Sequence, residues 1–269
     1  DDGRLDQALV DLDKALEIYP DYSDAFTNRG IIYHRRKQLD LAIRDAGEAI
    51  RCNERNPSAW NNRGNAYIEL KQYDKAVADF TKLVEIEPDR VDGYYGRANT
   101  YYLAQQFPEA LNDVERVIER SPGDYKADNT KGNILKSMGE HQKAVTAFST
   151  GIDLLLKEAR SAQDPCLEAV ERCLKGDLSR HEVALQFRNR TTLATILGNR
   201  ADAYRNLIEK FENAKPLMFD DLSRAINLHP ENPLYYLARG QQRYHQKNFL
   251  DAINDFDKVL TIQPGNVDA

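Results

Sequence analysis

A period of 34 residues constrains this chain of 269 residues more than any other feature of its sequence. Several independent positions keep that spacing: an alanine, a small residue, a large aromatic residue and a tyrosine. They are Ala8, Ala42, Ala76, Ala110 and Ala144; Gly30, Gly64, Ala98 and Gly132; Phe26, Trp60 and Tyr94; and Tyr33, Tyr67 and Tyr101. Such repetition indicates stacked copies of one unit that cannot bury its apolar face alone.

Residues 57–90 show what one unit contains. Two apolar stripes with the spacing of a helix are separated by the short polar turn 71–74. The stripes are Trp60, Gly64 and Tyr67, and then Ala76, Phe80 and Leu83. Pro57 stands where a helix can begin, and Pro88 stands where the second helix must end. The pattern therefore predicts two antiparallel helices in each unit.

The motif W-x3-G-x2-Y, followed by A-x3-F and a proline, resembles the tetratricopeptide repeat. The letters "NRG" before the tyrosine resemble repeats common in bacterial members of that family. The resemblance covers residues 1–156 and 193–264. It implies an all-α solenoid, a right-handed superhelix of helix-turn-helix repeats. It also implies that the concave face, lined mainly by the first helix of each pair, binds peptide segments of partner proteins.

The repeat positions predict the organisation of the chain. A partial unit, 1–22, precedes four repeats, at 23–56, 57–90, 91–124 and 125–158, and residues 193–269 continue the same solenoid. Between them, 157–192 is a helical insertion, with one helix expected from Asp164-Pro165 to Gly176 and another from near Ser179. The insertion either packs against its neighbours or serves partner binding or self-association. The repeat that follows it has a longer inter-helix connection, near 212–215.

Both ends of the chain fall inside the repeat pattern. Residues 1–22 carry only a second helix, and Val267-Asp268-Ala269 resembles the start of another repeat. We therefore expect a piece of a longer protein, in which a targeting segment or a catalytic domain can lie outside the given sequence.

Charges also follow the repeat. An arginine precedes the small residue of the first helix in five units, and each of those units has an aspartate in its second helix. The pairs are Arg29 with Asp45, Arg63 with Asp79, Arg97 with Asp113, Arg200 with Asp221, and Arg239 with Asp255. The one unit with a lysine, Lys131, has Ala147 in place of the aspartate. This covariation predicts bidentate ion pairs between the two helices, a geometry that lysine cannot reproduce.

The composition excludes several classes of protein. With 37 basic and 43 acidic residues the net charge is −6, which does not suit a nucleic-acid binder. The longest apolar run, 234–238, is far too short for a membrane span. Three sparse cysteines, Cys52, Cys166 and Cys173, favour a reducing compartment, and we expect a cytoplasmic protein.

No catalytic or cofactor motif emerges from the sequence. His181-Glu182 begins an HExxH zinc motif, but Leu185 stands where the second histidine is required. No P-loop, GxGxxG or GxSxG is present. We therefore expect no catalytic residue, no metal and no cofactor.

Asparagines on the first helices are the candidate binding residues. The family resemblance assigns groove-lining positions, and these carry an incomplete asparagine ladder with two neighbouring tyrosines. The candidate groove residues are Asn28, Asn61, Asn62, Asn65, Tyr95, Asn99, Tyr102, Asn129, Asn133 and Asn199. An asparagine amide can donate to and accept from a peptide main chain whatever its sequence. The alternative interpretation is a solvated polar helix surface.

The ladder resembles the one in the tetratricopeptide domain of the O-linked N-acetylglucosamine transferase. The carboxylate clamp of chaperone-binding members does not match, since Asn61 replaces its lysine and Gly96 replaces an asparagine. We predict a non-enzymatic scaffold for protein–protein interaction. The alternatives are a substrate-recruiting arm of a larger enzyme and a metal-dependent hydrolase built on the insertion.

Overall fold

The computed structural model describes residues 2–177, 184, 186–211, 213–266 and 268. Fourteen helices hold 77% of these described residues, and no strand occurs among them. The predicted all-α fold is confirmed.

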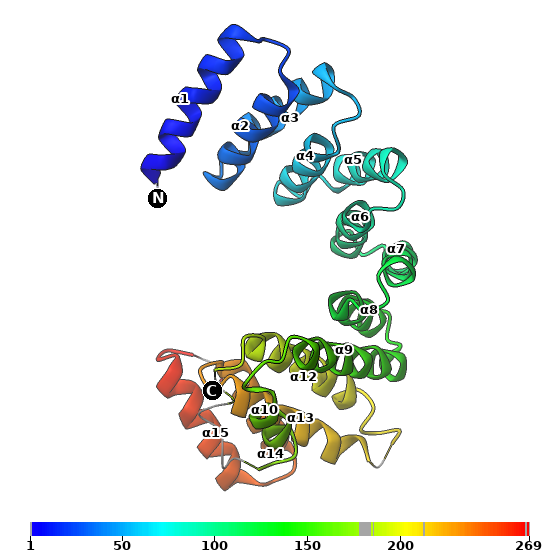
Figure 1. The fold of residues 1–269 in the computed structure, drawn as a ribbon. Helices are drawn as coiled ribbons and strands as arrows, with labels where there is room; N and C mark the ends of the chain where they lie inside the picture. Colours follow the sequence, from blue (N-terminus) through cyan, green and yellow to red (C-terminus); the bar gives the residue numbers. More distant parts are fainter. Residues whose placement is uncertain (1, 178–183, 185, 212, 267, 269) are drawn as a thin grey trace. The chain divides into compact units, whose positions relative to one another are not determined.

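The chain divides into two compact units, Asp1–Pro122 and Gly123–Ala269, close to the predicted junction between the repeats 91–124 and 125–158. In the first unit, α1 precedes three pairs of helices in which each first helix packs on the second (Figure 1). Its helices are α1 Asp2–Ile18, α2 Ser23–Arg35, α3 Leu39–Cys52, α4 Pro57–Glu69, α5 Tyr73–Ile86, α6 Val91–Leu103 and α7 Phe107–Arg120.

The second unit also pairs its helices, α8 with α9, α12 with α13 and α14 with α15. Helix α12 packs directly on α8 and α9, so the pair after the insertion stacks on the pair before it. The helices are α8 Tyr125–Ser137, α9 His141–Ser161, α10 Leu167–Leu174, α12 Arg190–Arg205, α13 Ala214–Leu228, α14 Pro233–His245 and α15 Phe249–Ile262.

Helix α4 shows how the sequence sets a helix start. It begins at Pro57, as predicted, and the Asn56 side chain accepts a hydrogen bond of 3.2 Å from the Ala59 amide. The Asn56 Nδ2 donates to the hydroxyls of Ser23 and Thr27 in the preceding pair. One buried side chain therefore caps its own helix and fixes it to the previous repeat.

First and second helices occupy different sides of the stack in the first unit. Helix α2 packs against α4, and α4 packs against α6. Among the described residues, the second helices α3, α5 and α7 do not pack against one another to the same degree. Helices on the inside of a curved stack approach more closely than those outside. The first helices therefore form the inner face of this unit.

All five predicted ion pairs are present. In each pair the arginine Nε and Nη2 donate to the two oxygens of one aspartate, at 2.6–3.0 Å. The aspartates are buried, and the arginines are mostly covered. Two parallel hydrogen bonds fix the crossing of the two helices in each repeat.

The same arginines also reach the preceding repeat, which the sequence pattern did not reveal. Four of them donate from Nη1 to an oxygen on the second helix of the repeat before. The acceptors are Asp13 for Arg29, Thr81 for Arg97, Ser149 for Arg200 and Ser223 for Arg239. For Arg63 the residue at this position is Gly47, so the bond is missing.

Gly47→Ser is therefore expected to raise the free energy of unfolding by about 1 kcal/mol, shared between helix propensity and one new hydrogen bond. A Cβ at Gly47 meets only the Arg63 Nη1, at 3.8 Å. Urea unfolding measures the gain. In a chain that lacks the Arg63 guanidinium, Gly47→Ser should raise the free energy of unfolding only by the part that comes from helix propensity. An equal increase with and without the guanidinium would show that the hydrogen bond does not form.

The insertion packs on the second helices of its unit. Helix α10 contacts α9 and α13, and buries Leu167, Val170 and Cys173. It begins two residues later than predicted, because Asp164 accepts a hydrogen bond from the Cys166 amide in a turn before the helix. Gly176, with φ of 86°, ends it as expected. The second stretch expected from Ser179 lies mainly outside the described residues. Self-association through 157–192 remains a prediction.

Candidate functional site

The ten candidate groove residues all lie on first helices. Seven belong to the first unit, on α2, α4 and α6, and three belong to the second, on α8 and α12. Asn28 and Asn99 are exposed, and the others are partly buried. The two groups are described separately, and only some members line a cavity.

Asn62 and Asn65 line a cavity of about 120 Å³ between α2 and α4. The remaining lining residues are Ile31, His34 and Arg35 from α2. The Asn62 Nδ2 is buried and has no hydrogen-bond partner. A buried donor without a partner is costly, so this amide is available to a ligand. We call this cavity the α2–α4 pocket.

His34, Lys37 and Glu69 form a polar cluster beside the α2–α4 pocket. The His34 Nε2 is 3.2 Å from a Glu69 oxygen, and the Lys37 ammonium is 2.9 Å from the other. The hydrogen bond from Lys37 lowers the pKa of Glu69, which therefore stays ionised at neutral pH. His34 and Arg35 are not among the predicted groove residues, because neither belongs to the asparagine pattern.

Asn199 lines a second cavity, of about 210 Å³, in the second unit. Its lining mixes polar side chains, among them Asp202 and Arg205, with apolar ones. The wall comes from α12, α13 and α14 and includes Met218, Leu222, Leu234 and Tyr235. This cavity can take one apolar side chain, and it is smaller than the roughly 300–1,000 Å³ of small-molecule sites.

The other candidates lie outside these two cavities. The ring of Tyr102 packs against Phe107, with 5.8 Å between centroids, so this tyrosine contributes to the packing of its own repeat. The Asn129 Oδ1 is buried and has no hydrogen-bond partner. Asn28, Asn61, Tyr95, Asn99 and Asn133 line neither of the two cavities on the first helices.

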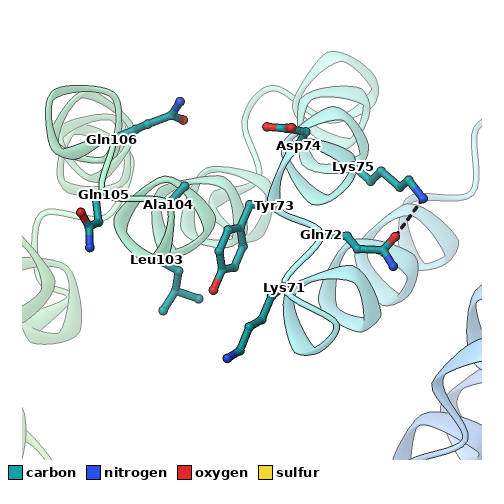
Figure 2. Close-up of a pocket in the computed structure, with 9 residues that line it drawn as sticks. All are labelled: Lys71, Gln72, Tyr73, Asp74, Lys75, Leu103, Ala104, Gln105 and Gln106. Carbon is teal, nitrogen blue, oxygen red and sulfur yellow. Dashed lines mark hydrogen bonds between the residues drawn. The ribbon is translucent and has the colours of Figure 1, made fainter.

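A larger cavity, of about 640 Å³, lies elsewhere, at the turns of two neighbouring repeats. Figure 2 shows Tyr73 between these turns and Lys75 directed toward Gln72, with which it forms a hydrogen bond of 2.8 Å. Lysine, carboxamide and apolar groups are mixed there. No set of like groups converges, so we do not assign a binding role to this rim.

Among the described residues, no group of three or more His, Cys, Asp or Glu side chains could hold a metal. Burial raises the pKa of the Cys166 and Cys173 thiols, which disfavours the reactive thiolate. The incomplete zinc motif at His181-Glu182 lies outside the described residues. None of the described helices is long and apolar enough to cross a bilayer.

Paired helices stacked on one another define a helical repeat protein. Two family models described as tetratricopeptide repeat match, over residues 12–44 and 57–90. The chain therefore carries tetratricopeptide repeats at these residues. A comparison with curated protein sequences found no match.

Solved structures share the fold. The Cut9 and Hcn1 hetero-tetramer of APC/C aligns with 99% of this chain at 15% identity and a TM-score of 0.66, and the chain spans only 45% of that protein. A tetratricopeptide repeat protein from Parabacteroides merdae covers 99% of this chain and aligns over 90% of its own, at 20% identity and a TM-score of 0.63. YrrB, described as having an unusual peptide-binding site, covers 85% of this chain and aligns over 97% of its own, at 18% identity and a TM-score of 0.56.

Proposed function

We propose that this chain is a non-enzymatic scaffold that binds an extended segment of another protein on its first helices. Tetratricopeptide repeats typically mediate protein–protein interaction. The single observation that carries the proposal is the α2–α4 pocket, in which two candidate asparagines meet and one buried amide donor has no partner. The similarity in fold to YrrB, described as a peptide-binding protein, agrees with this function.

Asparagine at these positions has no structural advantage. It lowers helix propensity relative to alanine, by roughly 0.5 kcal/mol at each site. Amides that can donate and accept are suited to the main chain of a bound segment. Because such contacts are many and individually small, we expect roughly micromolar affinity for one segment.

A substrate-recruiting arm of a larger enzyme would use the same surface. In that case the bound segment belongs to the enzyme's substrate, and a catalytic domain lies in the same protein. The full-length gene distinguishes this alternative from a scaffold. Binding by the present chain is expected in both cases.

Replacing Asn62, Asn65 and Asn99 together with alanine should weaken peptide binding at least tenfold and leave the fold intact. Random linear peptides displayed on phage are selected on the unchanged protein, and the affinities of the best ones are measured by fluorescence anisotropy. Loss of several amide contacts, each contributing about 1 kcal/mol, gives this magnitude. The helical signal and melting temperature should not fall, since alanine is the better helix former.

A matched control replaces Asn112 and Asn254, which are exposed on the second helices α7 and α15. These changes should leave the affinity unchanged. If the triple variant keeps its affinity, the binding site does not lie on the first helices. The insertion would then be the next surface to mutate.

A further inference from the structure

We infer that the α2–α4 pocket receives the carboxylate of an aspartate or glutamate side chain within the bound segment. This inference rests on the proposed function and names the chemistry that the segment must carry. The pocket is lined by Asn62, Asn65, His34 and Arg35, with Ile31 as its apolar wall. Amide and guanidinium side chains, both of which carry N–H donors, therefore line one small space.

Arg35 supplies the positive charge. Its side chain is exposed, and it forms no ion pair within the described part of the chain. Its neighbour Arg36 differs, because its guanidinium bonds Asp6 on α1 at 2.6 Å. Glu69, a carboxylate beside the pocket, is already held by Lys37 at 2.9 Å and lies 3.2 Å from the His34 Nε2. Arg35 thus remains the uncompensated cation of this pocket.

The buried Asn62 Nδ2 supplies a donor with no partner in the protein. A carboxylate oxygen can accept this hydrogen bond while the other oxygen accepts from the Arg35 guanidinium. Charge-assisted hydrogen bonds of this kind are about twice as strong as neutral ones. A carboxylate therefore satisfies both groups at once.

Charge and size distinguish a carboxylate from other anions. One arginine balances a single negative charge, whereas a phosphate carries about −1.5 to −2 at neutral pH. The volume of about 120 Å³ suits a side chain and is too small for a metabolite. Helix α4 also packs on α6, the first helix of the next repeat, so the row of first helices continues beyond the pocket and a chain can run through rather than end there. These features favour an internal acidic residue.

The test uses peptides selected on the unchanged protein. They should share an aspartate or glutamate at one fixed position. Replacing that residue with asparagine or glutamine, respectively, should weaken binding about tenfold, the effect of one charge-assisted hydrogen bond. In the Arg35→Leu protein the same peptide change should alter affinity less than twofold. Selection on Arg35→Glu should instead enrich lysine or arginine at that position.

Arg55→Leu is the matched control, because Arg55 is exposed in the turn before α4. This substitution removes the same charge as Arg35→Leu. It should preserve both the affinity and the acidic preference. Selected peptides without a fixed acidic residue, or an acidic preference that survives Arg35→Leu, would overturn the inference while leaving peptide binding established. A selection that enriches no peptide would overturn the proposed function itself.

Discussion

Asp79→Ala is expected to lower the free energy of unfolding by about 3 kcal/mol, one of the two largest effects we predict. The substitution leaves the Arg63 guanidinium mostly covered and without its two hydrogen bonds of 2.8 Å. The desolvation penalty of that charge then has no compensation. Trp60, the single tryptophan of the chain, lies 4.9 Å from the Arg63 guanidinium, so its fluorescence reports unfolding at this site.

The double variant Arg63→Met with Asp79→Leu should stay within about 1 kcal/mol of the unchanged protein. Both charges are then removed, and apolar side chains of similar size fill their places. A double variant as unstable as the single one would show that the ion pair itself is strongly stabilising. The two variants together separate the cost of an orphaned charge from the value of the pair.

The difference in stability between the double variant and the unchanged protein should depend on pH, and the sign of this dependence can be derived. Burial raises the pKa of the Asp79 carboxyl above its ordinary value, against the opposing hydrogen bonds from Arg63. The folded protein therefore holds this proton more tightly than the unfolded chain, and stability falls as pH rises through that acidic window. The double variant lacks this dependence. Its stability relative to the unchanged protein should increase as pH rises from about 4, which urea unfolding at several pH values measures.

Gly96→Ala should destabilise the chain by about 2 kcal/mol, although alanine is the better helix former. A Cβ at this position would lie under 3.0 Å from three atoms of the Phe80 ring. Phe80 is fully buried in a cluster with Trp60, Ala76 and Leu83, so its ring has little room to shift. Packing against a neighbouring repeat therefore requires a glycine here.

Gly30→Ala is the control for this prediction, because its nearest neighbour, the Ala42 carbonyl oxygen, is 3.4 Å from the new Cβ. That substitution should be neutral or stabilising in thermal unfolding. Combining Gly96→Ala with Phe80→Leu should destabilise less than the sum of the two single changes. Strict additivity would show that the two residues do not compete for the same space.

The sequence alone determined the fold. In a solenoid each unit contacts only its neighbours, so a 34-residue period fixes the helices, their turns and their partners. For the same reason the paired occurrence of Arg63 and Asp79 was enough to predict their contact, which the structure shows at 2.8 Å. The candidate asparagines were also placed on the first helices, where they are found.

Tertiary structure decided what the period could not encode. Gly96 interrupts the asparagine ladder because Phe80 of the preceding repeat fills the space, a fact about two side chains in different units. The second contact of the arginines, to Thr81 or its equivalents, crosses repeats in the same way. Arg35 and His34 join Asn62 only because α2 lies beside α4. A repeat pattern records which positions are shared, whereas the α2–α4 pocket combines side chains of two different repeats that only the packing of their helices brings together.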